Sequence, residues 1–162
     1  MSVPPGIRSS RWTAESLPSG LASLAEAARD EGYLFLARLQ DEWAGGAVRF
    51  AGPGECLFVA EVGDCLVGIG GICRDPYQLD PDVGRLRHVY VAKAFRSRGI
   101  ASALIRACLA CSGTEFRVIR LSTSTLNPMA GRLYEQLGFQ PTAVAGERAT
   151  HALSTNRVRI SS

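Results

Sequence analysis

A mixed β-sheet flanked by helices is the fold that the sequence predicts, within a single domain spanning residues 1–162. The first observation is the order of the expected elements: strand, two helices, three strands, helix, strand, helix and two strands. Because this order neither alternates strictly nor separates helices from strands, it favours a mixed sheet. The second observation is length, since a chain of 162 residues matches one domain with a sizeable core.

The first part of the chain predicts a strand and two helices behind a flexible leader. The leader covers residues 1–6, which are rich in proline and glycine. A short strand is expected within residues 10–17. The next stretch has helical composition and predicts two helices, at 21–31 and 34–43, because Gly32 interrupts the run.

The middle of the chain predicts a β-hairpin and a third strand. Two apolar runs, at residues 56–62 and 65–75, are separated by the turn dipeptide Gly-Asp, a spacing typical of hairpins. Residues 76–84 contain proline, glycine and aspartate and predict a loop. Residues 85–92 predict the third strand.

The last part of the chain predicts two helices and three further strands. The helices are expected at 97–112 and 127–138, with a strand at 116–123 between them and two closing strands at 139–147 and 150–155. The second helix has residues typical of an N-cap, a first position and a C′ position, which are Asn127, Pro128 and Gly138.

Composition and charge exclude several classes of protein. The formal net charge is +3, which is too small a surplus to indicate a nucleic-acid-binding protein. No apolar run approaches the roughly 18 residues that span a bilayer, and the N-terminus lacks the charged and apolar segments of a secretion signal. We therefore expect a cytoplasmic protein, a monomer or a homodimer, whose partners include neither nucleic acid nor a membrane.

The five cysteines predict free thiols rather than disulfides. An odd number without a secretion signal argues against a disulfide framework. Cys108 and Cys111 form a C-x-x-C motif within an expected helix, which leaves redox or zinc chemistry open. Because a zinc site needs a second pair of ligands, we expect no metal, and thiols that are buried in the core.

A cluster of Arg96, Arg98 and Gly99 at the start of the expected helix is the first sign of a binding site. Like charges at the positive end of a helix dipole cost stability unless an anion offsets them. A strand, a turn with glycine and a helix N-terminus together suit a phosphate, and arginine would add charge-assisted hydrogen bonds. The alternative is a solvated basic helix start, because the Walker and dinucleotide-binding patterns are absent there.

Two motifs in order resemble the GNAT superfamily of N-acetyltransferases. The segment "RHVYVAKAFRSRGIASALI" is similar to motif A of that family, V-x-x-x-x-[QR]-x-x-G-x-[GA], through Val91, Arg96, Gly99 and Ala101. Ala101 stands where glycine is common. Downstream, "NPMAGRLYEQLGF" is similar to motif B, through Asn127, Ala130, Leu133, Tyr134, Glu135, Gly138 and Phe139. The resemblance covers residues 56–139 well.

The resemblance implies a fold and a cofactor. The implied fold is a mostly antiparallel sheet whose central strands splay apart, and the implied cofactor is acetyl-CoA. Its pyrophosphate would lie against the backbone N–H groups of residues 96–101, and its pantetheine arm would pair with the strand backbone at residues 89–91. The residues that would bind acetyl-CoA are Val89, Tyr90, Val91, Arg96, Ser97, Arg98, Gly99, Ile100, Ala101, Asn127 and Tyr134.

The implied reaction is direct attack of an amine on the thioester, which needs an oxyanion donor and a general acid. By resemblance, the backbone N–H of Val89 would stabilise the oxyanion, and Tyr134 would protonate the leaving thiolate. Two alternatives stay open: Tyr134 packs on the sheet without a catalytic role, and Asn127 only caps its helix.

The sequence does not identify the general base. Family members that use a strand glutamate near the position of Arg85 find no match, because arginine is not a base at neutral pH. His88 is one candidate base, since its ordinary pKa lies near about 6.5, and the alternative is a packed or hydrogen-bonded histidine. Further candidates, acting through water, are Asp75, Asp80 and Asp82.

The acceptor is expected to be an amine of a small molecule or a peptide. It would bind between the first two helices and the loops that face the sheet opening, where the distinctive side chains are Tyr33, Phe35, Arg38, Trp43 and Phe50. Two rival functions stay open. One is a non-catalytic acyl-CoA-binding module with the same fold, and the other is a phosphate- or nucleotide-binding domain unrelated to acyl transfer.

Overall fold

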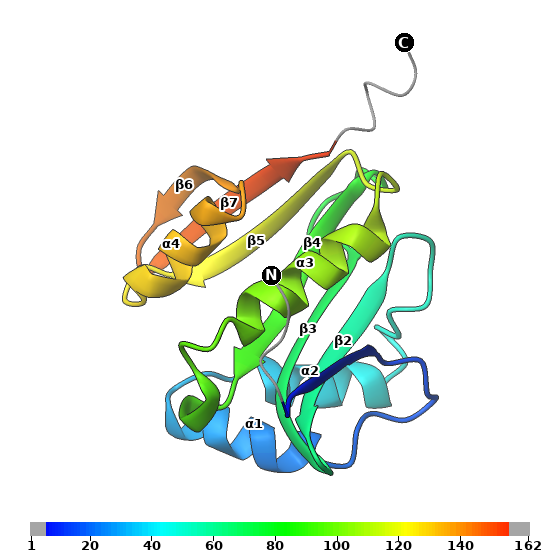
Figure 1. Cartoon of the computed structure of the whole chain (residues 1–162). Coiled ribbons are helices and arrows are strands. Elements are labelled where there is room, and N and C mark those ends of the chain that lie inside the picture. The colour runs from blue at the N-terminus through cyan, green and yellow to red at the C-terminus, as the bar shows by residue number, and fades with distance from the viewer. Residues whose placement is uncertain (1–5, 156–162) are drawn as a thin grey trace.

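Residues 6–155 are described by the computed structural model, and their strands form one seven-stranded sheet (Figure 1). The strands are β1 (Arg8–Arg11), β2 (Cys56–Val62), β3 (Cys65–Arg74), β4 (Val83–Val91), β5 (Val118–Ser124), β6 (Gln140–Ala145) and β7 (Arg148–Ser154). Their order across the sheet is β1-β2-β3-β4-β5-β7-β6. Every neighbouring pair is antiparallel except β4 and β5, which run parallel. The predicted mixed, mostly antiparallel sheet is confirmed.

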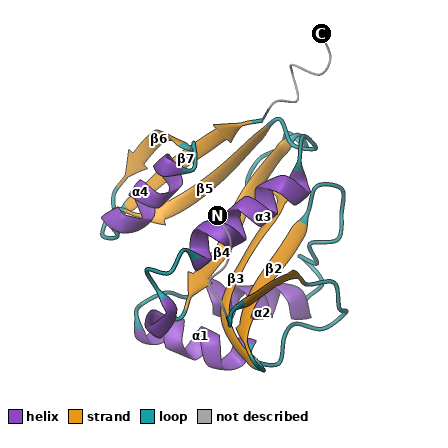
Figure 2. Ribbon diagram, viewed as in Figure 1, coloured by secondary structure: helices purple, strands orange, loops and turns teal. Residues whose placement is uncertain are grey.

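Within the same residues, four α-helices cover the two faces of the sheet (Figure 2). They are α1 (Leu21–Asp30), α2 (Phe35–Ala44), α3 (Ile100–Ser112) and α4 (Pro128–Gln136). The apolar residues of α1 and α2 share a core with Leu57 and Ile69 of the sheet. On the opposite face, Ile105 of α3 and Leu133 of α4 belong to a second core with Ile72. The sheet therefore separates α1 and α2 from α3 and α4.

The helix expected from residue 97 begins only at Ile100. A short 3-10 turn (Lys93–Phe95) follows β4, and Ser97 and Gly99 then have φ angles of 64° and 79°. Positive φ angles are incompatible with a right-handed helix. Residues 97–99, which the sequence predicts to begin the helix, therefore form a tight non-helical turn before it.

The first strand also differs from expectation. The strand expected at 10–17 lies earlier, at Arg8–Arg11, because this segment pairs with the edge of the hairpin from Arg8↔Glu61 to Arg11↔Phe58. The leader predicted to be flexible, residues 1–6, falls outside the described residues except for Gly6.

The predicted boundaries of α4 are confirmed. Asn127 is the N-cap, and its Oδ1 accepts a hydrogen bond from the N–H of Ala130 at 3.3 Å. Pro128 occupies the first position, and Gly138 follows the C-cap with a φ of 101°. These caps fix the start of α4 close to the end of β5.

The two parallel strands part after a short run of pairing. β4 and β5 pair only from Val83↔Val118 to Arg85↔Arg120. Beyond that point β4 stays paired with β3, as far as Val91, and β5 stays paired with β7, as far as Ser124. The sheet therefore opens between β4 and β5 (Figure 1), as the implied fold requires.

A β-bulge lies in β4 beside this opening. The register runs from Gly71↔Arg87 to Ile69↔Tyr90, so His88 and Val89 together oppose a single residue of β3. His88 adopts a φ of 63°, in the left-handed region, so the backbone departs from the extended strand conformation at the bulge. The peptide groups at the bulge therefore lie outside the regular hydrogen-bonded pairing of β3 with β4, at a point where β5 no longer pairs with β4.

The five cysteines are free thiols, as predicted. Cys56, Cys73 and Cys108 are buried, whereas Cys65 is exposed and Cys111 is partly exposed. The expectation of buried thiols therefore holds for the first three only. Within residues 6–155, no group of three or more His, Cys, Asp or Glu side chains could hold a metal ion.

Candidate active site

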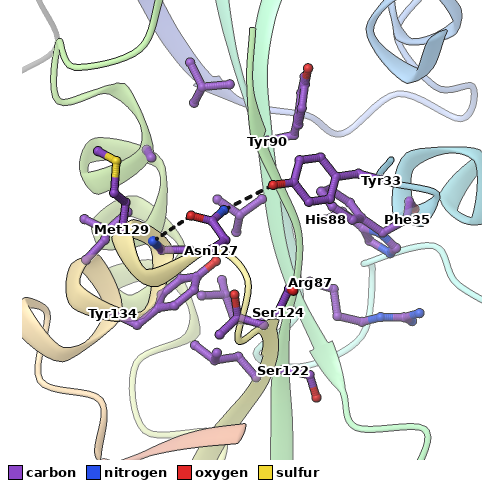
Figure 3. A pocket seen from close by; sticks show the side chains of 18 of the residues that line it. Tyr33, Phe35, Arg87, His88, Tyr90, Ser122, Ser124, Asn127, Met129 and Tyr134 are labelled. Carbon is purple, nitrogen blue, oxygen red and sulfur yellow. Dashed lines mark hydrogen bonds between the residues drawn. The ribbon is translucent and has the colours of Figure 1, made fainter. Parts of the chain in front are cut away.

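A pocket of about 1150 Å³ lies where β4 and β5 diverge (Figure 3). It is lined by the connection between α1 and α2, by β4 and β5, by the start of α3 and by α4. The predicted site residues that line it are His88, Val89, Tyr90, Val91, Arg96, Ser97, Gly99, Ile100, Ala101, Asn127 and Tyr134. Arg98 does not line it, and its guanidinium instead lies 5.4 Å from the centroid of the Phe95 ring.

The start of α3 presents backbone N–H groups that no side chain caps. Its N-cap is Gly99, which has no side chain to accept a hydrogen bond. Within residues 6–155, the first-turn N–H groups of Ile100, Ala101 and Ser102 therefore have no acceptor. Uncapped N–H groups at the positive end of a helix form an anion site. The geometry suits the pyrophosphate expected here.

The side chain of Arg96 is held by the protein, in contrast to the expected phosphate contact. Its two terminal nitrogens donate to the Glu31 carboxylate, each at 2.7 Å, and its Nε donates to the Val91 carbonyl at 2.9 Å. The Tyr90 hydroxyl donates to the same carboxylate. The hydrogen bonds from Arg96 are the main reason that the pKa of Glu31 lies below its usual value. Glu31 thus ties the end of α1 to the turn before α3, and the backbone is left to contact a phosphate.

Tyr134 projects from α4 into the opening of the sheet (Figure 3). Its ring packs edge-on against Phe139, with the ring centroids 6.0 Å apart. The hydroxyl makes no hydrogen bond within residues 6–155, and desolvation raises the pKa of Tyr134 to about 12. The phenol therefore keeps its proton at neutral pH. A protonated hydroxyl without a protein partner is available to a bound ligand.

Asn127 links the two sides of the pocket. Its Oδ1 caps α4, and its Nδ2 donates to the Tyr33 hydroxyl at 3.2 Å (Figure 3). Tyr33 lies in the connection between α1 and α2, on the far side of the opening from α4. Asn127 is therefore more than a helix cap, because it also holds the rim of the pocket together.

Comparison with known proteins agrees with this geometry. The family model of the acetyltransferase (GNAT) family matches residues 9–139. The chain belongs to the GNAT family. This membership excludes the rival interpretation of a phosphate-binding domain unrelated to acyl transfer.

Two solved GNAT-fold structures illustrate the likeness. One, from Exiguobacterium sp. 255-15 and assigned as an acetyltransferase, is 26% identical with a TM-score of 0.74, and the match covers 96% of this chain and 97% of that one. An acetyltransferase from Streptococcus agalactiae 2603 is 15% identical with a TM-score of 0.70, and the match covers 93% and 99% of the two chains. The second likeness concerns the fold alone.

Curated relatives of this GNAT protein match over about half of the chain. Human N-acetyltransferase 8 is 33% identical over 91 residues, and human N-acetyltransferase 8B is 34% identical over a segment of the same length. Each match covers 55% of this chain and 40% of the relative. The chain thus spans well under two thirds of the length of these relatives.

In residues 6–155, no helix is long and apolar enough to cross a membrane.

The side of the pocket near α2 corresponds to the expected acceptor side of this GNAT protein. Tyr33, Phe35 and Arg38 line the pocket, as expected. Trp43 and Phe50 do not line it. The indole N–H of Trp43 donates to a backbone carbonyl at 3.1 Å, and Phe50 is buried in the core beneath α1 and α2. Further lining residues that sequence reasoning missed are Tyr77, Arg87, Ser122, Ser124, Arg132, Glu147 and Arg148.

Within residues 6–155, His88 is the one predicted base that lines the pocket. The Nδ1–H of His88 donates to the Phe35 carbonyl at 3.0 Å, and its buried Nε2 has no partner among residues 6–155. Burial, together with the nearby charges of Arg87 and Arg38, lowers the pKa of His88 to about 3. A base role for His88 stays a prediction, and this low basicity does not favour it.

The acidic candidates lie away from the pocket or are already paired. Asp75 is buried and contacts Arg85 at 3.4 Å. Asp80 contacts Arg117 at 2.6 Å, and Asp82 lines a separate, smaller pocket. Among the residues that line the main pocket, the one acidic side chain is that of Glu147.

The buried neutral state of His88 predicts a pH-dependent stability. The unfolded chain binds a proton at this position below about pH 6.5, whereas the folded chain does so only near pH 3. The contribution of neutral His88 is therefore present above about pH 6.5 and is lost as the pH falls toward 3. Replacing His88 with asparagine, which tolerates a positive φ, should reduce the loss of unfolding free energy between pH 7 and pH 5 by about 1–2 kcal/mol.

Urea unfolding of both proteins at the two pH values measures this difference. Because each variant is compared with itself, a packing defect in the His88→Asn protein does not enter the result. Equal losses in the two proteins would show that His88 is protonated in the folded state at pH 5.

Proposed function

We propose that the protein is an acetyl-CoA-dependent N-acetyltransferase, formed by residues 1–162 as one domain, that acetylates an amine of a small molecule or a peptide. The observation that carries the proposal is the arrangement around one pocket of an uncapped helix start, a β-bulge and a free tyrosine hydroxyl. In this proposal the protein acts in the cytoplasm as a monomer or homodimer, and its partners do not include nucleic acid, a membrane or a metal.

The start of α3 would hold the pyrophosphate of acetyl-CoA. The uncapped N–H groups of Ile100 and Ala101 point outward from the positive end of the helix. Ser97 and Gly99 line the same pocket, and their positive φ angles shape the turn around the anion. Arg96, whose guanidinium is paired with Glu31, would fix the turn rather than neutralise the phosphate.

The edge of β4 would bind the pantetheine arm and the thioester. Residues 89–91 line the pocket where β5 has moved away, so the arm can take the place of a neighbouring strand. Val89 lies at the bulge, and its backbone N–H is the proposed donor to the oxyanion that develops on the thioester carbonyl. When bound, acetyl-CoA supplies the activated acyl group.

Tyr134 would act as the general acid, with Asn127 beside it. The Tyr134 hydroxyl is protonated at neutral pH and has no protein partner within residues 6–155. A general acid must hold its proton until the leaving group needs it. A thiol has an ordinary pKa of about 8.5, below the value of about 12 for the Tyr134 phenol. The phenol would therefore donate its proton as negative charge builds up on sulfur, and the proton that the attacking amine releases would restore the phenol.

Binding of acetyl-CoA should raise the melting temperature of the protein. A ligand that binds only the folded state stabilises it by mass action, by about 2.7 kcal/mol at one hundred times its dissociation constant. For a chain of 162 residues this corresponds to roughly 5–10 °C. Differential scanning fluorimetry with acetyl-CoA, and with adenosine monophosphate as a control that lacks the pyrophosphate, measures the shift. Equal shifts with the two ligands would contradict the assigned pyrophosphate site.

The rival that stays open is a non-catalytic acyl-CoA-binding module, and the weak basicity of His88 favours it. An assay of free thiol release from acetyl-CoA, with a panel of amines, separates the two functions. An enzyme should release thiol only when a suitable amine is present. A binding module should show the thermal shift and no amine-dependent release.

A further inference from the structure

The acceptor side of the pocket is rich in arginine and poor in acid. Arg38 of α2 and Arg85 and Arg87 of β4 line it, and the one acidic lining residue, Glu147, belongs to the β6–β7 turn. An amine that arrives as an ammonium ion is repelled by such cations. A surplus of arginine is instead typical of sites that bind a carboxylate or a phosphate. Because Arg85 and Arg87 have acidic partners, the charge of Arg38 is the one that favours an acceptor with an anionic group of its own.

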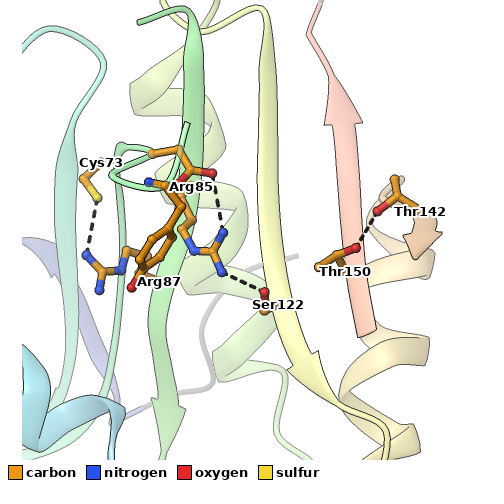
Figure 4. Close-up of polar contacts among 8 residues, drawn as sticks. Cys73, Arg85, Arg87, Ser122, Thr142 and Thr150 are labelled. Atoms are coloured by element: carbon orange, nitrogen blue, oxygen red, sulfur yellow. Dashed lines mark hydrogen bonds and ion pairs between the residues drawn. The ribbon is translucent and has the colours of Figure 1, made fainter. Parts of the chain in front are cut away.

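Side-chain partners fix the two arginines of β4 in place, and Figure 4 shows the contacts of Arg85 with Ser122 and of Arg87 with Cys73. Arg85 donates to Ser122 Oγ at 2.7 Å and contacts Asp75 at 3.4 Å. Arg87 donates to Glu42 at 2.8 Å and contacts Cys73 Sγ at 4.0 Å. Their side chains are only 13% and 9% exposed. Each guanidinium keeps further N–H donors beyond these contacts, so a ligand would meet a rigid pair of cations.

Arg38 differs from this pair because no side-chain partner within residues 6–155 fixes its guanidinium. Arg38 is exposed and lines the pocket, and its guanidinium has no hydrogen bond or ion pair within residues 6–155. Arg38 and Arg87 both lie near His88, since the charge of each contributes to the low pKa of that imidazole. An unpaired arginine next to a fixed one can close on an anion that the fixed one holds.

Aromatic side chains form the remaining wall. Tyr33 and Phe35 line the pocket next to each other, with ring centroids 5.6 Å apart. The Tyr77 ring lies under the Arg85 guanidinium, 4.9 Å from its centre. A wall of this kind suits an apolar or aromatic group on the acceptor.

We propose that the acceptor is an amino acid or a close analogue with an apolar side chain, and that Arg38 and Arg87 bind its carboxylate. The proposal rests on the proposed acetyltransferase function. Arg87 and Val89 lie on either side of His88 at the bulge of β4, so an acceptor whose carboxylate contacts Arg87 can place its amine at the thioester end of the same pocket. An amino acid carries both an amine and a carboxylate.

Matched acceptors test the proposal. Initial rates are measured with L-phenylalanine, L-phenylalaninamide and 2-phenylethylamine, which carry a carboxylate, a neutral amide and a hydrogen atom, respectively, at the same carbon. We expect kcat/KM for L-phenylalanine to exceed that for the other two at least tenfold. Replacing Arg38 with glutamine should raise KM for L-phenylalanine about tenfold and leave KM for 2-phenylethylamine unchanged. The control Arg106→Gln removes an exposed charge from α3, on the other face of the sheet, and should change neither.

Two results would overturn the proposal while leaving the acetyltransferase function in place. One is equal or better turnover of the amine that lacks a carboxylate, and the other is an equal effect of Arg38→Gln on both acceptors. A calorimetric titration with N-acetyl-L-phenylalanine and CoA gives a readout besides activity. If the protein binds CoA but shows no affinity for this product, the carboxylate site is wrong. If it binds neither CoA nor acetyl-CoA, the proposed function itself fails.

Discussion

Replacing Tyr134 with phenylalanine is expected to lower kcat about 100-fold, the low end of what a general acid contributes. The substitution removes one hydroxyl and almost no volume, and that hydroxyl makes no hydrogen bond within residues 6–155. The edge-on packing of the ring on Phe139 is therefore retained. Because the proposed phosphate contacts belong to α3, the affinity for acetyl-CoA should be unchanged. Steady-state kinetics with a productive amine, and a calorimetric titration of acetyl-CoA, measure the two quantities.

The split between kcat and KM decides what Tyr134 does. A loss confined to kcat indicates an interaction made in the transition state. Full activity in the variant would mean that water protonates the thiolate, and the general-acid role would be withdrawn. A loss explained wholly by weaker binding would mean that Tyr134 only orders the cofactor. The free energy of unfolding, measured in parallel, separates these outcomes from damage to the fold.

Local sequence signals were enough to predict the parts of the site that depend on local structure. Asn127, Pro128 and Gly138 are capping residues whose preferences follow from the helix termini themselves, and α4 begins and ends where they predict. The hairpin of β2 and β3 is likewise set by two apolar runs and a turn dipeptide. Tyr134 enters the opening because its helix is fixed at the end of β5.

Contacts between distant segments were not predictable in the same way. The sequence predicts a phosphate contact for Arg96 because this residue lies at the positive end of an expected helix, whereas its partner in the fold, Glu31, lies 65 residues away. His88 was a candidate base because an isolated histidine has a suitable pKa. Its burial beneath α2 and its place in the bulge, which lower that pKa to about 3, arise only when the sheet forms. The arginine pair of β4 needed the same assembly, because its partners come from α2, β3 and β5.

Among single substitutions, replacing Gly99 with a residue that has a side chain should weaken cofactor binding the most. Its φ of 79° is strained for a β-branched residue, and its peptide group begins the uncapped turn that would face the pyrophosphate. Replacing Gly99 with valine should abolish the thermal shift that acetyl-CoA produces. The β-branched side chain would both block the approach of the phosphates and rotate the first N–H groups of α3 away from them.

Gly113 supplies the matched control, because it lies at the other end of α3 with a φ of 58° and nothing within 4 Å of an added Cβ. Gly113→Val introduces comparable backbone strain into the same helix. We expect both variants to unfold at a lower temperature than the parent in the absence of ligand. Only Gly113→Val should keep the shift with acetyl-CoA, and calorimetric titration should find at least a hundredfold weaker binding to Gly99→Val alone. If Gly99→Val is folded and binds acetyl-CoA as the parent does, the pyrophosphate does not lie at the start of α3.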